Sequence, residues 1–386
     1  MTLYIFSLSF FILIFTFYIY PNEAIAPNNP SYLELQIPNK SSLTTLLAVG
    51  DVMLSRNIGT AIDKTNNPNL PFEKVRDLLN GADITFGNLE CPLSDSDIPI
   101  REGLVFRCLT KYVPGLRFAG FDVMSTANNH SFDQGEKQIG FTVDYLKSQN
   151  ILPVGTGKDF KEAHAGTVVS PPREGEMQEG VMVRFGFLAY SYSARNDGKK
   201  TIDPQIATVD SDQVAKDIQS IKNRGADIVI ISMHAGIEYT RRPNPEQIDF
   251  AHAAIDAGAD VVIGHHPHWI QDIEIYPPFS PPASSESDGI GGDPPASSRE
   301  ASRAGEEGVH RGLILYSLGN FVFDQAWSAD TTEGLAVELT FANDKLESAK
   351  LIPIVIENNC CPRIATEEEK QKILKKNNQE SDIIQF

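Results

Sequence analysis

The sequence predicts an α/β fold built from layers of strands and helices. From residue 44 onward, short apolar runs alternate with stretches whose apolar residues recur at helical spacing. This alternation is typical of strands joined by helical crossovers. The 386 residues are 41% hydrophobic and include 28 glycines, which is ordinary for a globular chain of one large domain or two smaller ones. Disordered, fibrous and polytopic membrane proteins are therefore excluded.

The first 26 residues are expected to be a signal peptide or a membrane anchor. Residues 1–20 carry no charged side chain and 16 of them are apolar, which suits a membrane span or the core of a signal peptide. Ala24-Ile25-Ala26 is a candidate cleavage site. A buried N-terminal helix is the alternative. We expect export and an extracytoplasmic location, with residues 27–43 as a polar linker.

The periodicity then places each element in order. Buried strands are predicted at 44–50, 82–87, 121–126, 151–155, 226–232 and 259–264. Helices are predicted at 71–80, 136–149, 211–224 and 245–257. Antiparallel strands are predicted for a hairpin within 166–190 and for the runs 311–318, 334–341 and 348–356. A βα-barrel also alternates strands with helices, but the antiparallel segments favour open layers.

Two segments are expected to lie outside the packed core. Between 277 and 312, Pro, Gly and Ser fill 19 of 36 positions, which predicts a disordered insertion between two strands. Residues 357–386 form a polar tail, for which we expect a weak helix and a frayed end. The main domain is therefore expected to span 44–356.

Metal-binding side chains follow five of the predicted strands. They are Asp51, Asn88, Glu90, Asn128, Asn129, His130, His234, His265, His266 and His268. The carboxyl ends of strands in an open α/β sheet form the crevice where ligands bind, so these segments are expected to converge. We expect no nucleic-acid partner, because 33 basic against 51 acidic residues give a net charge of −18.

Each of these residues also has a structural explanation. Asp51 could be a helix cap or turn residue, Asn128 and Asn129 could form a turn, and His234 could be a hydrogen-bonded interior side chain. Asn88 could be another turn residue, and Glu90 a surface charge. The run Gly-His-His-Pro-His at 264–268 is harder to explain in this way. A structural account would have to hold at all five strand ends, so we favour a metal site.

The ligand types indicate which metal. His, Asp, Glu and Asn without Cys favour Mn²⁺, Zn²⁺, Fe or Mg²⁺. Two such ions could activate a water and stabilise the leaving oxygen. His130, next to a candidate ligand, is placed to act as a general acid or to touch the substrate. Cys91 and Cys108 flank site segments and are expected to lie near each other, where they could pair in an exported protein.

The motifs resemble a known family. They are residues 50–53, 87–90, 127–130 with Asp133 and Gly135, 234–239, 264–268 with Gln271, and 317–321. In this order they are similar to the CapA-type poly-γ-glutamate capsule synthesis proteins, a branch of the calcineurin-like metallophosphatase superfamily. The resemblance implies a four-layer α/β/β/α sandwich with mixed sheets.

The resemblance also implies roles for individual residues. The implied metal ligands, for one or two divalent ions, are Asp51, Glu90, Asn129, His234, His265 and His268. The implied catalytic residues are His130, Asn128 and Asp133. Asn88, Arg107, Glu238 and Tyr239 are the candidates for substrate binding. Met53 stands where the superfamily usually has a histidine, and Glu90 where it has a bridging carboxylate.

Three functions follow as expectations. The first is an extracytoplasmic, metallophosphatase-like hydrolase of poly-γ-glutamate capsule biosynthesis or export, anchored by its N-terminal segment and working in a capsule synthesis complex. The second is a general metallophosphoesterase that acts on phosphate esters. The third is a non-catalytic scaffold subunit whose site holds an anionic polymer.

Overall fold

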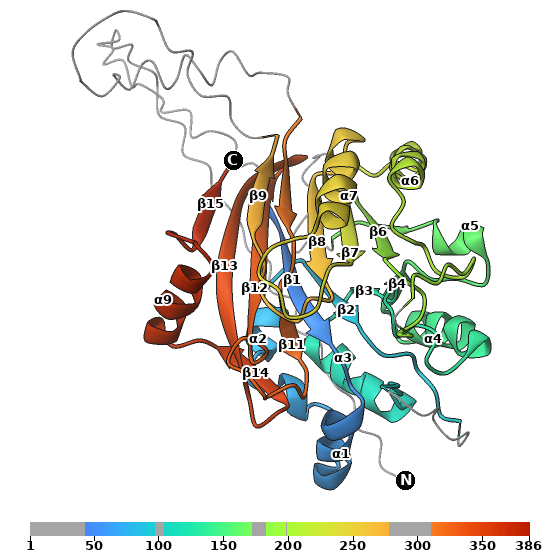
Figure 1. Ribbon diagram of the computed structural model, residues 1–386, viewed down its shortest axis with the longest axis vertical. Coiled ribbons are helices and arrows are strands. Elements are labelled where there is room, and N and C mark those ends of the chain that lie inside the picture. The colour runs from blue at the N-terminus through green and yellow to red at the C-terminus, as the bar shows by residue number, and fades with distance from the viewer. Residues whose placement is uncertain (1–42, 97–103, 172–182, 198, 278–309) are drawn as a thin grey trace, which may run out of the picture. The chain divides into compact units, whose positions relative to one another are not determined.

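The computed structural model describes residues 43–96, 104–171, 183–197, 199–277 and 310–386, which fold around two mixed β-sheets (Figure 1). The first sheet has the order β14 (Cys361–Ile364), β13 (Lys345–Glu357), β12 (Glu333–Ala342), β1 (Leu43–Val52), β2 (Ile84–Leu89), β3 (Val123–Ser125) and β4 (Leu152–Val154), with β11 (Asn320–Val322) beside β1 and β15 (Ile383–Gln385) beside β13. The second has the order β5 (Thr167–Val169), β6 (Phe185–Ser191), β7 (Ile228–His234), β8 (Val261–His265), β10 (Gly312–Leu315) and β9 (Ile273–Tyr276).

Helices cover the outer face of each sheet, and the last helix of the chain instead buries side chains in the core between the sheets. They are α1 (Arg56–Thr65), η1 (Leu70–Phe72), α2 (Arg76–Leu79), η2 (Thr110–Tyr112), α3 (Val113–Ala119), α4 (Glu136–Ser148), α5 (Phe160–Ala163), α6 (Ser211–Asn223), α7 (Pro245–Asp256) and α9 (Glu367–Lys376). On the first sheet, Ile58 of α1 and Leu116 of α3 share a core with Leu47 of β1. On the second, α6 and α7 pack over β6, β7 and β8.

A third core lies between the two sheets. Side chains of a strand alternate between its faces, so Leu46 of β1 points into this core while its neighbour Leu47 packs under the helices. The rings of Phe86 in β2 and Phe187 in β6 stack across the gap with their centroids 5.6 Å apart. Three cores separate four layers, which confirms the predicted α/β/β/α sandwich with mixed sheets.

All six predicted buried strands are present, and the main differences concern weakly patterned segments. The helix predicted at 71–80 is reduced to η1 and α2, whereas α1 and α3 were not predicted. β10, predicted as an antiparallel strand, pairs antiparallel with β9, which was not predicted, and it also runs parallel to β8. No described helix is long and apolar enough to cross a membrane. The predictions for residues 1–26, and for the linker up to residue 42, fall outside the described residues.

The C-terminal segment differs from the expected frayed tail. The predicted helix exists as α9, whose start is fixed by reciprocal hydrogen bonds between Thr366 and Glu369. The residues before it form β14, and the last residues form β15, which pairs antiparallel with β13. Ile373 of α9 is buried in the core between the sheets. A polar segment with few apolar anchors has therefore become part of the first sheet.

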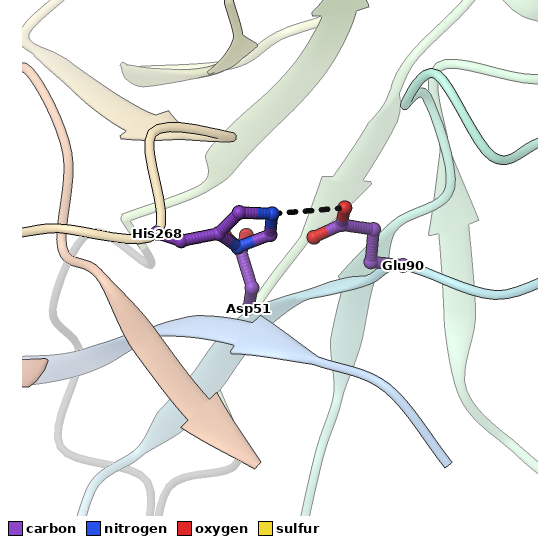
Figure 2. A group of neighbouring side chains, drawn as sticks. All are labelled: Asp51, Glu90 and His268. Atoms are coloured by element: carbon purple, nitrogen blue, oxygen red, sulfur yellow. Dashed lines mark ion pairs between the residues drawn. The ribbon is translucent and has the colours of Figure 1, made fainter. Parts of the chain in front are cut away.

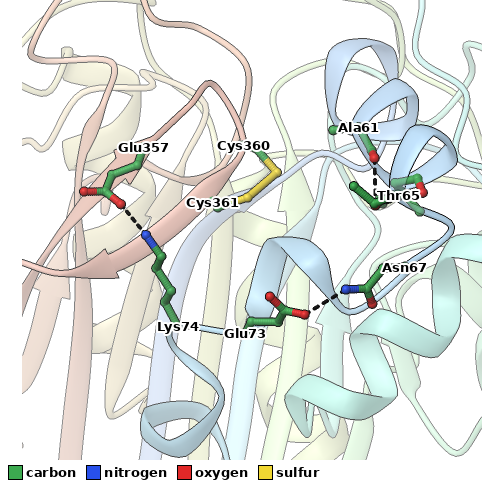
Figure 3. The surroundings of a disulfide bond; sticks show 9 residues. Ala61, Thr65, Asn67, Glu73, Lys74, Glu357, Cys360 and Cys361 are labelled. Atoms are coloured by element: carbon green, nitrogen blue, oxygen red, sulfur yellow. Dashed lines mark hydrogen bonds and ion pairs between the residues drawn. A yellow bond between two sulfur atoms is a disulfide. The ribbon is translucent and has the colours of Figure 1, made fainter.

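The cysteines differ partly from expectation. Cys360 and Cys361 form a disulfide in the turn between β13 and β14, near the ion pair of Lys74 with Glu357 (Figure 3). Cys91 and Cys108 are buried, free thiols. Burial and a hydrogen bond with the Cys91 thiol raise the pKa of Cys108. The two thiols therefore lie together, as predicted, but they are not joined.

The predicted insertion joins two adjacent strand ends. Tyr276, the last residue of β9, pairs directly with Gly312, the first residue of β10. Residues 278–309, on which the prediction of disorder falls, lie outside the described residues.

Removing residues 278–308 and closing the hairpin with a short turn is expected to leave the domain folded. The paired strand ends need no long connection, and the entropy of loop closure grows slowly with loop length. A thermal melt of the full chain and the deletion variant checks this. We expect the melting temperatures to agree within about 5 °C, and a larger fall would mean that the segment contributes to the packed structure.

Candidate metal centre

The candidate site lies where strand ends from both sheets meet. Asp51 is the second-last residue of β1, and Glu90 directly follows β2. His234 and His265 end the neighbouring parallel strands β7 and β8, where they are paired in register. All four side chains are completely buried. Folding therefore brings together ligands from distant parts of the sequence, from Asp51 to His265.

Glycines allow the close approach of these strands. A Cβ atom on Gly50 would lie 2.0 Å from the carbonyl oxygen of Gly319, and one on Gly264 would lie 1.9 Å from that of Tyr316. No other residue fits there without moving the backbone. The glycines before Asp51 and His265 in the sequence motifs therefore have a packing role that sets the position of both ligands.

Asp51, Glu90 and His268 form the tightest group (Figure 2). One ligand atom from each lies within 4.8 Å of the others. The Nδ1 atom of His268 is 3.5 Å from Asp51 Oδ2, and its Nε2 atom is 3.9 Å from Glu90 Oε1. The backbone of His268 is left-handed, with φ of 58°, a strained conformation that turns the ring toward the two carboxylates.

The remaining predicted ligands form a second group beside the first. Asn129 Oδ1 lies 3.0 Å from His234 Nε2, and His265 Nδ1 lies 3.2 Å from Asp51 Oδ1. Asn88 connects the groups, because its side-chain nitrogen is 2.9 Å from Asp51 Oδ1 and 3.3 Å from His234 Nδ1. The residue between the two groups is thus the neutral amide of Asn88, while Glu90 lies on the side of His268.

The unpaired polar atoms of the site fit a metal ion. Both carboxylate oxygens of Glu90 and the Nε2 atom of His265 are buried without a hydrogen-bond partner among the described residues, and the Nδ1 atom of His265 has only Asp51 Oδ1 beside it. Such atoms are rare in folded proteins, because burying them unpaired costs about 1–3 kcal/mol each. A divalent cation would give the oxygens and the imidazole nitrogen the partner they lack.

The electrostatics of the site agree with this interpretation. Burial, followed by the charges of Asp51 and Glu238, raises the pKa of Glu90 well above its ordinary value. Burial opposes ionisation of Asp51 too, but His265 and His268 outweigh it and hold the pKa of Asp51 well below its usual range. Burial lowers the pKa of His234, which keeps this imidazole in the neutral form that binds metals.

His130 is oriented by a carboxylate and an aromatic ring. Its Nδ1 atom lies 2.6 Å from Asp133 Oδ2, which also accepts a hydrogen bond from the backbone N–H of Phe106. The phenyl ring of Phe106 stacks on the imidazole with a centroid distance of 3.8 Å. The other ring nitrogen, Nε2, is 3.9 Å from Glu90 and 3.4 Å from Asn196. Asn196 was missed by the sequence analysis, because a single Asn in a loop carries no signal.

The other predicted site residues have different surroundings. Asn128 donates to the carbonyl oxygen of Leu89 and accepts from the backbone N–H of His130, so it positions the loop. The Arg107 guanidinium donates to the carbonyl oxygen of Ser96. These contacts give Asn128 and Arg107 structural roles, and the catalytic role of Asn128 and the substrate-binding role of Arg107 stay predictions.

Tyr239 and Glu238 lie on the side of His268. The Tyr239 ring is stacked with the His268 ring at 5.9 Å, and its hydroxyl accepts a hydrogen bond from Gln325. Both residues are half-buried. The backbone N–H of His266 donates to Asp51, and its ring lies 4.7 Å from the ring of Tyr192. His266 therefore contacts the site through its backbone, whereas His265 and His268 approach Asp51 with their rings.

The sandwich fold and a buried site of Asp, Glu, Asn and His define a metallophosphatase-like protein. Residues 45–325 match the family "Bacterial capsule synthesis protein PGA_cap", and the chain belongs to this family. It is 25% identical over 367 residues to the capsule biosynthesis protein CapA of Bacillus anthracis, covering 94% of this chain and 77% of the relative. It is 26% identical over 335 residues to the PGA biosynthesis protein CapA of Bacillus subtilis, covering 84% and 75%.

A solved structure similar in fold is the calcineurin-like phosphoesterase YfkN of Bacillus subtilis. The TM-score is 0.43 with 13% sequence identity, and the match covers 87% of this chain and 96% of that chain.

Proposed function

We propose that this protein is an extracytoplasmic, metal-dependent hydrolase of poly-γ-glutamate capsule biosynthesis or export. The observation that carries the hydrolase assignment is the set of buried, unpaired ligand atoms on Glu90 and His265, next to an oriented His130. Membership of the capsule synthesis family and the names of the Bacillus relatives support the biological role. The apolar residues 1–20 support the location.

Asp51, Glu90 and His268 would hold the ion most tightly. They supply the only two carboxylates among the predicted ligands, and charge attracts a dication more strongly than neutral donors do. Asn129, His234 and His265 would supply neutral donor atoms to a second ion. This ion would share the Asp51 carboxylate with the first. We therefore propose one strongly held ion and a weaker second position, because Asn88, which lies between the groups, carries no charge.

The bound ion would polarise a scissile carbonyl or phosphoryl group and lower the pKa of a water molecule. Asp133 accepts the Nδ1 proton of His130, which fixes the ring and leaves Nε2 directed toward Glu90. From that position His130 can deliver a proton to a leaving group, as a general acid does. Phe106 covers one face of the imidazole and excludes water from it.

Metal analysis and two hydrolysis assays test the proposal. The full chain is loaded with Mn²⁺ or Zn²⁺ and dialysed, its metal content is measured, and it is then assayed on poly-γ-glutamate and on a phosphodiester. We expect one retained ion per chain and metal-dependent shortening of poly-γ-glutamate. Hydrolysis of the phosphodiester alone would favour a general phosphoesterase. Retained metal with neither activity would favour a polymer-binding scaffold.

A further inference from the structure

A loop that contributes no predicted ligand runs across the site. It follows β6, whose last residue, Ser191, is paired in register with His234. The backbone N–H of Tyr192 donates to the carbonyl oxygen of His234 at 2.9 Å, and Asn196 lies 3.4 Å from the Nε2 atom of His130. Residues 192–196 therefore lead from one ligand group to the proposed general acid.

The position of this loop is fixed by internal hydrogen bonds. The N–H of Ala194 donates to the carbonyl oxygen of Thr201, and the N–H of Thr201 donates to the Ser193 hydroxyl. The same hydroxyl donates to the carbonyl oxygens of Arg195 and Lys199. Side chains between these anchors are thus held in a defined place near His130.

Arg195, within this loop, lies on an aromatic ring next to the site. Its guanidinium carbon is 4.0 Å from the centroid of Phe132, a buried ring two residues after His130. Arg195 is half-buried. Stacking on a ring holds the guanidinium in place and leaves its N–H edge free to donate hydrogen bonds.

Arg195 differs from a second arginine on the other side of His130. Arg56 lies over Phe106, 5.7 Å from its centroid, but it is paired with Asp324 at 3.2 Å. Arg195 has no carboxylate oxygen within 4.0 Å among the residues that the structure describes. In a chain with a net charge of −18, a half-buried guanidinium left unpaired beside a catalytic candidate calls for an anionic partner.

We propose that Arg195 forms an oxyanion-binding subsite beside His130, which holds a carboxylate or phosphate group of the substrate. This inference rests on the proposed function, because that function identifies His130 as part of the reacting centre. Asp51, Glu90 and Asp133 would repel an anionic substrate, and Arg195 offsets this repulsion at the edge of the site. Its planar fork of donors matches the two oxygens of either group.

Binding measurements on the metal-loaded full chain test the subsite. Arg195→Met keeps an apolar stem against Phe132 and removes the charge, and Arg195→Lys keeps the charge but not the fork. Arg117→Met, on the exposed side of α3, is the matched control because it makes the same change in net charge. The probes are a fluorescently labelled poly-γ-glutamate oligomer and inorganic phosphate, with metal content measured in every variant.

We expect Arg195→Met to weaken oligomer binding about tenfold or more, with Arg195→Lys intermediate and Arg117→Met within about twofold of wild type. Metal content should be equal in all four proteins. Equal oligomer and phosphate affinities in Arg195→Met and wild type would overturn the subsite, as would a wild type that binds neither probe. A loss confined to phosphate would keep the subsite and contradict the capsular substrate. Loss of the ion itself in Arg195→Met would show that Arg195 supports the metal centre, which would also overturn the proposal.

Discussion

Exchanging Glu90 for Gln is expected to lower the affinity for Mn²⁺ or Zn²⁺ by at least about a hundredfold. Glutamine keeps the shape of the side chain, but it removes one of the two carboxylates near His268 and places an N–H donor at the ion. Isothermal titration of the metal-free protein measures the change. In a hundredfold excess of metal over the wild-type Kd, the metal stabilises the wild type by ~2.7 kcal/mol, and the variant should lose about 2.3 kcal/mol or more of this.

Glu238→Gln is the matched control, because Glu238 is half-buried and contributes charge near Glu90 without belonging to the ligand group. Its effect on metal affinity is expected to be less than about tenfold. Equal affinities in wild type and Glu90→Gln would remove Glu90 from the metal centre and leave its unpaired oxygens without an explanation.

Without metal, Glu90→Gln is expected to be more stable than the wild type, which reverses their order in excess metal. The folded protein raises the pKa of Glu90, so the unfolded chain ionises first as the pH rises above the ordinary value of 4.5. The free energy of unfolding of the wild type then falls as the pH rises, until the pH passes the raised pKa of Glu90. Glu90→Gln cannot ionise, so without metal it should become increasingly more stable than wild type across this range. Denaturant unfolding at pH 4 and pH 7 in the presence of a chelator measures the difference.

Replacing His130 by Ala is expected to lower metal-dependent turnover by about 10²–10⁴-fold while metal content stays the same. The imidazole is held by Asp133 and Phe106 with Nε2 toward the site, a geometry suited to proton transfer. Turnover of poly-γ-glutamate and metal content are measured on the same preparations. A parallel loss of metal and turnover would instead make His130 a ligand.

His252→Ala provides the control for loss of an imidazole. His252 lies on α7 and contacts Glu274, away from the ligand groups. It should keep both metal and turnover. Asp133→Asn should retain metal and show an intermediate loss, because the amide supports the ring but no longer favours the required tautomer.

The parallel strands and the helices α4, α6 and α7 could be predicted because their patterns are strong. The runs at 44–50 and 226–232 each contain four consecutive apolar residues, at 46–49 and 228–231, as is typical of strands buried on both faces. The short helix α3 was missed, although Pro114 near its start and Gly120 after its end are helix boundary signals. The pairing of β15 was unpredictable from local sequence, since Ile383 and Ile384 gain their partners only through the long strand β13.

The candidate site could be predicted where several ligand types recur after strands. Asp51, Glu90 and His268 do converge, and so do Asn129 and His234. Sequence order could not show that Asn88, and not Glu90, lies between the two ligand groups. That depends on the twist and register of β2 beside β1.

The last residue of β9, Tyr276, and the first residue of β10, Gly312, lie toward the start of β8, away from the site. Leu313 of β10 pairs with Val261 at the start of β8, whereas His265 ends that strand. Tyr276 and Gly312 therefore lie at the end of the second sheet opposite the metal centre. A fluorophore or an affinity tag could be inserted between these two residues. A tag at that end would attach the protein to a surface with its site facing outward. Binding of long, charged polymers could then be measured on the immobilised protein.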